Sequence, residues 1–160
     1  MVLTKTISVT PTEKSRLPEV DFDNLTFGEI FTDHMFACDF KNGQWQKPEV
    51  VPYKEILLSP ASSALHYGQA VFEGMKAYKD DAGGVWLFRP ELNFERINIS
   101  CSRLGMPEFP KNYFFEGMKP SWNWMRVGYN PAWATHSTFV LLLLLVKHVS
   151  KQLPPMNINS

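Results

Sequence analysis

The sequence predicts an α+β fold in which an antiparallel β-sheet is combined with two helices. Segments of β-favouring residues come in two pairs, and a glycine-containing turn signal separates the members of each pair. Two helical segments follow the second pair. Strands and helices do not alternate as βαβ units require, so the sheet is expected to be antiparallel.

The first pair of strands is predicted around a tight turn. Residues 27–40 are rich in Phe, Ile, Thr and Met, which suits a strand. Asn42-Gly43 follows and supplies the positive φ angles that a type I′ hairpin turn requires. Residues 45–56 are the expected return strand. Its prolines, Pro48 and Pro52, suit a sheet edge because proline cannot donate a hydrogen bond to a ladder.

The second pair of strands is predicted on both sides of residues 80–84, which end in two glycines. Residues 74–79 form the incoming strand and residues 85–88 the outgoing one. The sequence around this turn lacks the spacing of a phosphate-cradling glycine loop. The glycines therefore predict a turn and nothing more.

A helix is predicted over residues 91–104. Pro90 suits the first helical position, while Gly105 and Pro107 end the segment. Its expected apolar face consists of Leu92, Phe94 or Glu95, Ile99 and Leu104. A second short helix is predicted at residues 113–118.

Composition and charge exclude several classes of partner. Sixteen basic and sixteen acidic side chains give no net charge, so we expect no binding to nucleic acid or to an anionic membrane. The longest apolar run, residues 139–146, is far shorter than the about 20 residues of a membrane-spanning helix. We expect it to be a buried strand or a sticky exposed one. Two cysteines are too few for a disulfide framework, and the N-terminal residues lack the apolar run of a signal peptide, so a cytoplasmic location is expected.

Arg96 is the first candidate functional residue. A guanidinium offers forked donors that match the oxygens of a phosphate ester, and a helix that follows a strand pair can carry it to the floor of a pocket. The alternative is an exposed helical arginine paired with Glu91 or Glu95. The spacing alone favours this alternative.

Other candidate residues are best explained structurally when judged by residue type alone. Tyr67 and Phe72 suit a hydrophobic core. His34 and His66 have no neighbouring Cys or His at ligand spacing, so we expect structural histidines and no metal site. Cys101 lies among apolar helix positions and is expected to be a small buried residue, not a nucleophile.

Four motifs together change this interpretation. They are Phe-Gly-x-x-Phe-Thr-Asp-His-Met at 27–35, His-Tyr-Gly at 66–68, Phe-Glu-Gly at 72–74 and Asn-x-x-Arg at 93–96. In this combination the chain resembles the branched-chain amino acid aminotransferases, which are pyridoxal-phosphate enzymes of fold type IV. The expected fold is the small N-terminal domain of those enzymes.

The resemblance implies roles for four side chains. Arg96 would bind the phosphate of pyridoxal 5′-phosphate, and Phe27, Tyr67 and Phe72 would line the pocket for the substrate side chain. The implied reaction moves an amino group between leucine, isoleucine or valine and 2-oxoglutarate. Intact family members are homodimers, and the resemblance leaves the assembly of this chain open.

The resemblance divides the chain into three parts. Residues 1–24 are expected to be a flexible arm, residues 25–118 the aminotransferase small domain, and residues 119–160 a poorly packed or disordered tail outside the family pattern. In the family, the lysine that forms the Schiff base lies in the second domain. The lysines Lys76, Lys79, Lys111 and Lys119 match no such position, so no catalytic residue is assigned and activity of this chain alone is not expected.

The tail is interpreted as the product of a reading-frame slip near residue 119. Trp and Met have single codons, so reading residues 121–126 from the third base of each codon forces (Leu, Met or Val)-Glu-Leu-Asp-(Ala or Glu). Residues 127–129 then permit Gly-Trp-Val, and residues 136–141 permit Ser-Phe-Tyr-Ile-Arg-Pro. Family members typically carry Leu-Asp-x-x-Trp-Val and then Leu-Tyr-Ile-Arg-Pro at this spacing.

Two alternatives to a truncated aminotransferase stay open. The chain can be a non-catalytic binding module that keeps half of a site. It can also be an aggregation-prone product in which the five leucines at 141–145 drive association.

Overall fold

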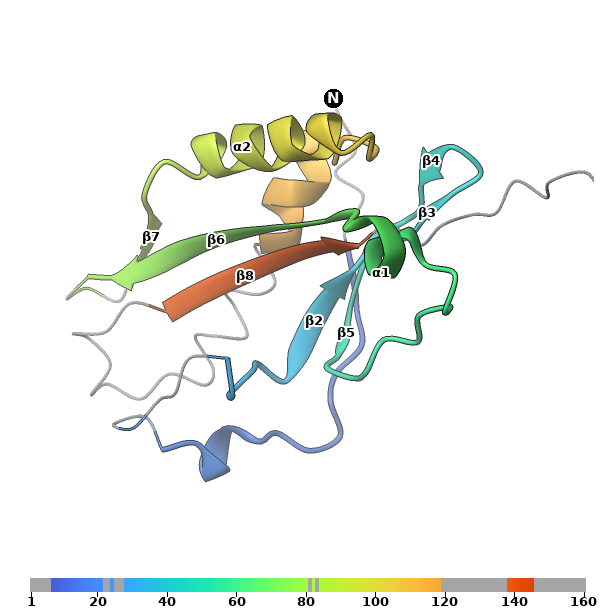
Figure 1. The fold of residues 1–160 in the computed structure, drawn as a ribbon. Helices are drawn as coiled ribbons and strands as arrows, with labels where there is room; N and C mark the ends of the chain where they lie inside the picture. Colours follow the sequence, from blue (N-terminus) through green and yellow to red (C-terminus); the bar gives the residue numbers. More distant parts are fainter. Residues whose placement is uncertain are drawn as a thin grey trace, which may run out of the picture.

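The structure, a computed structural model, describes residues 7–21, 24, 28–80, 82, 84–118 and 138–145. Its strands and helices confirm the α+β class (Figure 1). In chain order, the elements are β1 (Ser8–Val9), the 3₁₀ turn η1 (Leu17–Glu19), β2 (His34–Ala37), β3 (Phe40–Lys41), β4 (Gln44–Trp45), β5 (Glu49–Pro52), α1 (Ser63–Tyr67), β6 (Ala70–Lys79), β7 (Val85–Leu87), α2 (Pro90–Arg103), a helix at 111–118, and β8 (Thr138–Leu145).

The first sheet has the order β1-β5-β2. Strand β5 pairs antiparallel with β2, whereas the N-terminal strand β1 joins β5 in parallel, which the antiparallel prediction did not include. The long strands expected at 27–40 and 45–56 are shorter in the structure. Residues 45–56 divide into β4 and β5, and Pro48, which has no amide hydrogen, lies in the break.

The predicted hairpin turn is confirmed. Strands β3 and β4 pair antiparallel on either side of Asn42 and Gly43. Their φ angles are 53° and 75°, the left-handed values that a type I′ turn needs at both central positions.

The second sheet has the order β7-β6-β8 and is antiparallel throughout. Strand β6 is longer than the predicted strand at 74–79, since it begins at residue 70. Strand β8 lies along it, with Ala70 opposite Leu145 and Ala77 opposite Thr138. Eight residues of the tail therefore extend this sheet (Figure 1).

The two predicted helices are present. Helix α2 begins at Pro90, and Gly105 follows its end with a left-handed φ of 64°. The second helix begins at residue 111, two residues earlier than predicted. The short helix α1 was not predicted; it ends at Gly68, which is left-handed at φ 61° and ψ 24°. Over the described ranges, no helix has both the length and the apolar character needed to cross a bilayer.

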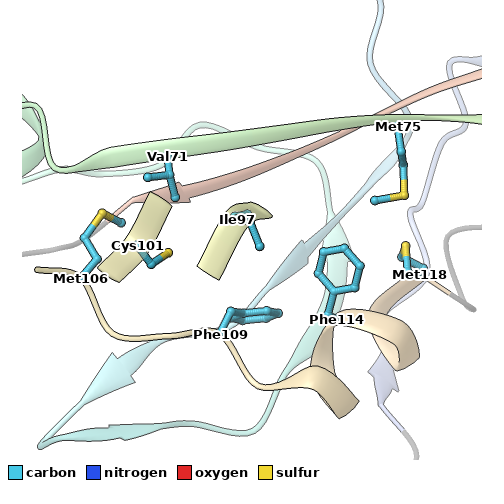
Figure 2. Close-up of a cluster of buried hydrophobic side chains, with 8 residues drawn as sticks. All are labelled: Val71, Met75, Ile97, Cys101, Met106, Phe109, Phe114 and Met118. Carbon is cyan, nitrogen blue, oxygen red and sulfur yellow. The ribbon is translucent and has the colours of Figure 1, made fainter. Parts of the chain in front are cut away.

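The hydrophobic core lies between β6 and α2 and is closed by the helix at 111–118 (Figure 2). Its members are Val71, Met75, Ile97, Cys101, Met106, Phe109, Phe114 and Met118. Along β6 the buried side chains alternate with exposed ones, so one face of the strand packs on α2. This face positions the candidate site.

The apolar face predicted for α2 was partly wrong. Leu92, Ile99 and Leu104 are exposed, whereas Phe94 packs against the core as predicted. Ile97 and Cys101, four residues apart, are buried against β6. The prediction that Cys101 is a small buried residue is confirmed, and burial raises the pKa of its thiol. A raised pKa opposes the formation of a thiolate nucleophile.

Candidate functional site

Glu73 is the buried charge at the centre of the candidate site. It lies on β6 between the core residues Val71 and Met75, and only 4% of its side chain is exposed. Alternation along the strand directs all three side chains to the face that packs on α2. A carboxylate at such a position requires charged and hydrogen-bonding partners, because burial disfavours an unpaired ion.

Arg96 of α2 is the charged partner of Glu73. Its Nε donates to Oε2 of Glu73 over 2.6 Å, and its Nη2 donates to Oε1. These two parallel bonds make the forked arrangement that fixes both the position and the plane of a guanidinium. The alternative pairing of Arg96 with Glu91 or Glu95, considered from sequence spacing, is therefore not the one found.

Two further donors complete the environment of the Glu73 carboxylate. Asn93, one helical turn before Arg96, donates from Nδ2 to Oε1 of Glu73 and to the Gly74 carbonyl, each over 3.2 Å. The Gly74 amide donates to Oε1 over 2.9 Å. Burial by itself raises the pKa of Glu73, but the hydrogen bonds from Arg96, Asn93 and Gly74 outweigh it and hold the pKa below its ordinary value. Glu73 is therefore ionised at neutral pH.

The far edge of the Arg96 guanidinium is available to a ligand. The arginine side chain is 66% exposed, although its Nε and Nη2 are held by Glu73. Within the part of the chain that the structure describes, Nη1 contacts no acceptor. The hydrogen bonds that Arg96 donates to the Glu73 carboxylate also raise the pKa of Arg96, so the cation is permanent. A fixed cation with free donors can bind an anionic oxygen, such as that of a phosphate ester.

The hydrogen bonds and ion pair of Arg96 involve Glu73 and neither Tyr67 nor Phe72. Phe72 is 75% exposed and lies on the face of β6 opposite to Glu73. Tyr67 is the last residue of α1, just before β6, and is 80% exposed. Phe27 lies outside the described residues. Neither Tyr67 nor Phe72 is a core aromatic, and their roles in a substrate pocket stay predictions.

The exposed face of the second sheet carries further aromatic side chains. A cavity of about 240 Å³ at β6 and β7 is lined by Tyr78, Trp86, Leu87 and Phe88. It includes none of the predicted site residues. In the described ranges, no group of three or more His, Cys, Asp or Glu side chains is arranged to hold a metal ion.

The roles of Glu73 and Asn93 were not predicted from the sequence. Both residues belong to motifs that carry the family resemblance, Phe-Glu-Gly and Asn-x-x-Arg. The sequence signal that could have revealed these roles is a glutamate in a strand, Glu73, together with an arginine, Arg96, that lies one helical turn after Asn93. The sequence alone could not show that these two segments lie side by side.

The chain matches known branched-chain aminotransferases over about three fifths of its length. It is 48% identical over 99 residues to branched-chain-amino-acid transaminase 1 of Bacillus subtilis, and the match covers 61% of this chain and 28% of that protein. It is 52% identical over 100 residues to a probable branched-chain-amino-acid aminotransferase of Staphylococcus epidermidis, and this match covers 62% of this chain and 28% of the relative. Over about 100 residues, the chain is therefore similar to branched-chain aminotransferases.

More distant members of the family match the same share of the chain. The branched-chain-amino-acid aminotransferase of Mycolicibacterium smegmatis is 42% identical to this chain over 97 residues, and the match covers 60% of this chain and 26% of the relative. No family model matches the chain. The chain spans between 26% and 31% of the length of the curated relatives it matches. The reaction of a whole branched-chain aminotransferase is therefore a proposal for this chain.

Proposed function

We propose that residues 25–118 are the small domain of a branched-chain amino acid aminotransferase that uses pyridoxal 5′-phosphate. The complete enzyme would exchange an amino group between leucine, isoleucine or valine and 2-oxoglutarate in the cytoplasm, as a homodimer. The observation that carries the proposal is the match of 42–52% identity to enzymes of that name. The exposed donor edge of Arg96, held in place by a buried carboxylate, supports it.

The residues present fit the cofactor's phosphate. Arg96 would hold that group through its free Nη1 edge, since two of its nitrogens are already held by Glu73. When bound, pyridoxal phosphate supplies an electron sink for the carbanion at the substrate's Cα. The side chains of Phe27, Tyr67 and Phe72 would exclude water and contact the branched side chain, where each buried methylene contributes about 0.8 kcal/mol.

The proposal assigns no catalytic lysine to this chain. The proton transfer at the substrate's Cα needs a lysine that forms the internal Schiff base. We propose that this lysine belongs to a second domain and that the 160-residue chain alone does not catalyse transamination. Adding the cofactor to the chain and treating it with borohydride tests this statement. A lysine fixed to the cofactor in a single defined position, together with turnover of leucine, would contradict it.

We also propose that a reading-frame slip near residue 119 produced the tail. The coding DNA tests this proposal directly. Sequencing across the codons for residues 118–121 should show an open frame in the shifted register that encodes a complete second domain with its lysine. The protein made from that frame should transaminate leucine with 2-oxoglutarate. A stop codon early in the shifted frame would overturn the frameshift interpretation without affecting the assignment of residues 25–118.

A further inference from the structure

The carboxylate of Glu73 occupies a fixed position in the fold. Val71 and Met75, which lie two residues before and after it on the same face of β6, pack in the core against α2 (Figure 2). Oε1 accepts hydrogen bonds from the Gly74 amide and from the side chains of Asn93 and Arg96, while Oε2 accepts from Arg96 Nε. Both oxygens of the carboxylate therefore accept hydrogen bonds.

This carboxylate removes the freedom of a long, solvent-exposed side chain. An arginine that is 66% exposed has many rotamers, and a ligand that binds it must fix one of them. The two parallel bonds to Glu73 fix the guanidinium before any ligand arrives. The remaining edge, with Nη1, is left with one orientation.

The same carboxylate also carries a negative charge, which opposes an incoming anion. Two effects of opposite sign thus act on phosphate binding. Fixing the guanidinium strengthens it, whereas the nearby charge weakens it. Because Arg96 is largely exposed, solvent screens the repulsion between Glu73 and an anion on the far edge of the guanidinium. We expect the positional effect to be the larger one.

We infer that Glu73 is a positioning residue that orients Arg96 toward a phosphate ester, with Asn93 holding the Glu73 carboxylate. This inference rests on the proposed function, in which Arg96 binds the cofactor's phosphate. It goes beyond that function by giving the glutamate of the Phe-Glu-Gly motif a defined task.

The test compares two ligands that differ only in the phosphate. Pyridoxine 5′-phosphate and pyridoxine lack the aldehyde, so neither forms imines with the lysines of the chain. Titration calorimetry of the full 160-residue chain measures the dissociation constant of each ligand. The dissociation constant of pyridoxine divided by that of pyridoxine 5′-phosphate isolates the contribution of the phosphate. We expect Glu73→Gln to lower this ratio by roughly two- to tenfold while the dissociation constant of pyridoxine stays unchanged. If Glu73 had a merely structural role, the substitution would change the dissociation constants of both ligands by the same factor.

Two further variants keep the result unambiguous. Glu95→Gln removes an exposed carboxylate from the same helix without touching Arg96 or Glu73, and it should leave the ratio unchanged. Asn93→Ala keeps the charge of Glu73 but removes its side-chain donor, and it should lower the ratio. If circular dichroism shows that Glu73→Gln does not fold, Asn93→Ala decides by the same criterion.

Failure of the inference is distinguishable from failure of the proposed function. If the wild-type chain does not prefer the phosphorylated ligand, or if Arg96→Ala keeps that preference, the phosphate role of Arg96 is wrong. If Arg96→Ala abolishes the preference but Glu73→Gln keeps or increases it, only the positioning role of Glu73 is overturned.

Discussion

Asn98 shows how a single polar side chain determines the path of the chain after α2. Its Nδ2 donates to the Phe109 carbonyl over 3.1 Å, and the Phe109 amide donates to its Oδ1 over 2.7 Å. Phe109 is only 3% exposed, so both of its backbone groups depend on Asn98 for hydrogen bonding. Nothing in the sequence distinguished this asparagine from a surface residue.

We predict that Asn98→Ala lowers the free energy of unfolding by about 1–3 kcal/mol, because the buried Phe109 amide and carbonyl lose their partner. Urea denaturation measures the change. Ser102→Ala, at an exposed position of the same helix, is the matched control and should stay within about 0.5 kcal/mol of wild type. An effect of Asn98→Ala no larger than the control would contradict the structural role of Asn98.

The pairing of Glu73 also predicts how stability depends on pH. Its pKa is lower in the folded state than the ordinary value of 4.5, so the unfolded state binds a proton more readily. The stabilisation is present above that ordinary value and is lost as the pH falls through the lowered one. The pKa of Asp33 is also lowered: burial raises it, but hydrogen bonds from Ser15 and Arg16 outweigh that effect. Asp33 therefore also contributes stability that is lost on acidification.

Glu73→Gln should therefore reduce the loss of stability on acidification without abolishing it, because Asp33 remains. Urea denaturation of both proteins from neutral pH into the acid range measures the difference in slope. Parallel curves for the two proteins would show that Glu73 titrates normally and is not paired with Arg96 in solution.

At the scale of elements, α2 illustrates how packing overrides an apparent apolar pattern. The stripe that faces β6 consists of Asn93, Ile97 and Cys101, each separated by four residues. It includes a polar residue and a small one, so the large apolar residues Leu92 and Ile99 dominated the sequence pattern. Those two are 44% and 54% exposed. The helix was predicted from its end signals and the burial of Cys101 from its apolar neighbours, but the burial of Ile97 was not predicted.

Two isoleucines of α2 provide a matched test of this orientation. Ile97 is 1% exposed and packs in the core, so Ile97→Ala should cost about 2–5 kcal/mol through lost burial and the cavity left behind. Ile99→Ala makes the same chemical change at an exposed position and should cost much less. Chemical denaturation of both variants measures the difference, and equal losses would contradict the orientation of the helix.

At the scale of the whole molecule, long-range contacts join the β3–β4 hairpin and the first sheet to the helical half. Trp45 of the hairpin donates from Nε1 to the Glu108 carbonyl over 2.7 Å and packs edge-on against Phe109. Phe36 of β2 also packs edge-on against Phe109, and its ring lies where a Cβ on Gly117 would be. Gly117 therefore permits the close approach of the helix at 111–118 to β2.

Strand β8 makes the second long-range connection, and its removal is a test at this scale. Ending the chain after Met118 removes the ladder between β8 and residues 70–77. We expect faster amide hydrogen exchange at residues 70–76 of β6, since β8 is the only described strand that pairs with them, whereas β7 pairs with residues 77–79. Amides of α2 serve as the internal control and should keep their protection. Unchanged exchange along β6 would show that the β8 ladder does not form in solution.

The sequence by itself determined the α+β class, the type I′ turn at Asn42-Gly43, the ends of α2 and the resemblance to branched-chain aminotransferases. These features depend on local φ preferences, on end signals and on short motifs, all of which a single segment contains. Tertiary structure alone decided the parallel pairing of β1, the buried face of α2 and the partner of Arg96. Each of these depends on contacts between segments far apart in the chain: Glu73 and Arg96 meet only because β6 and α2 pack face to face.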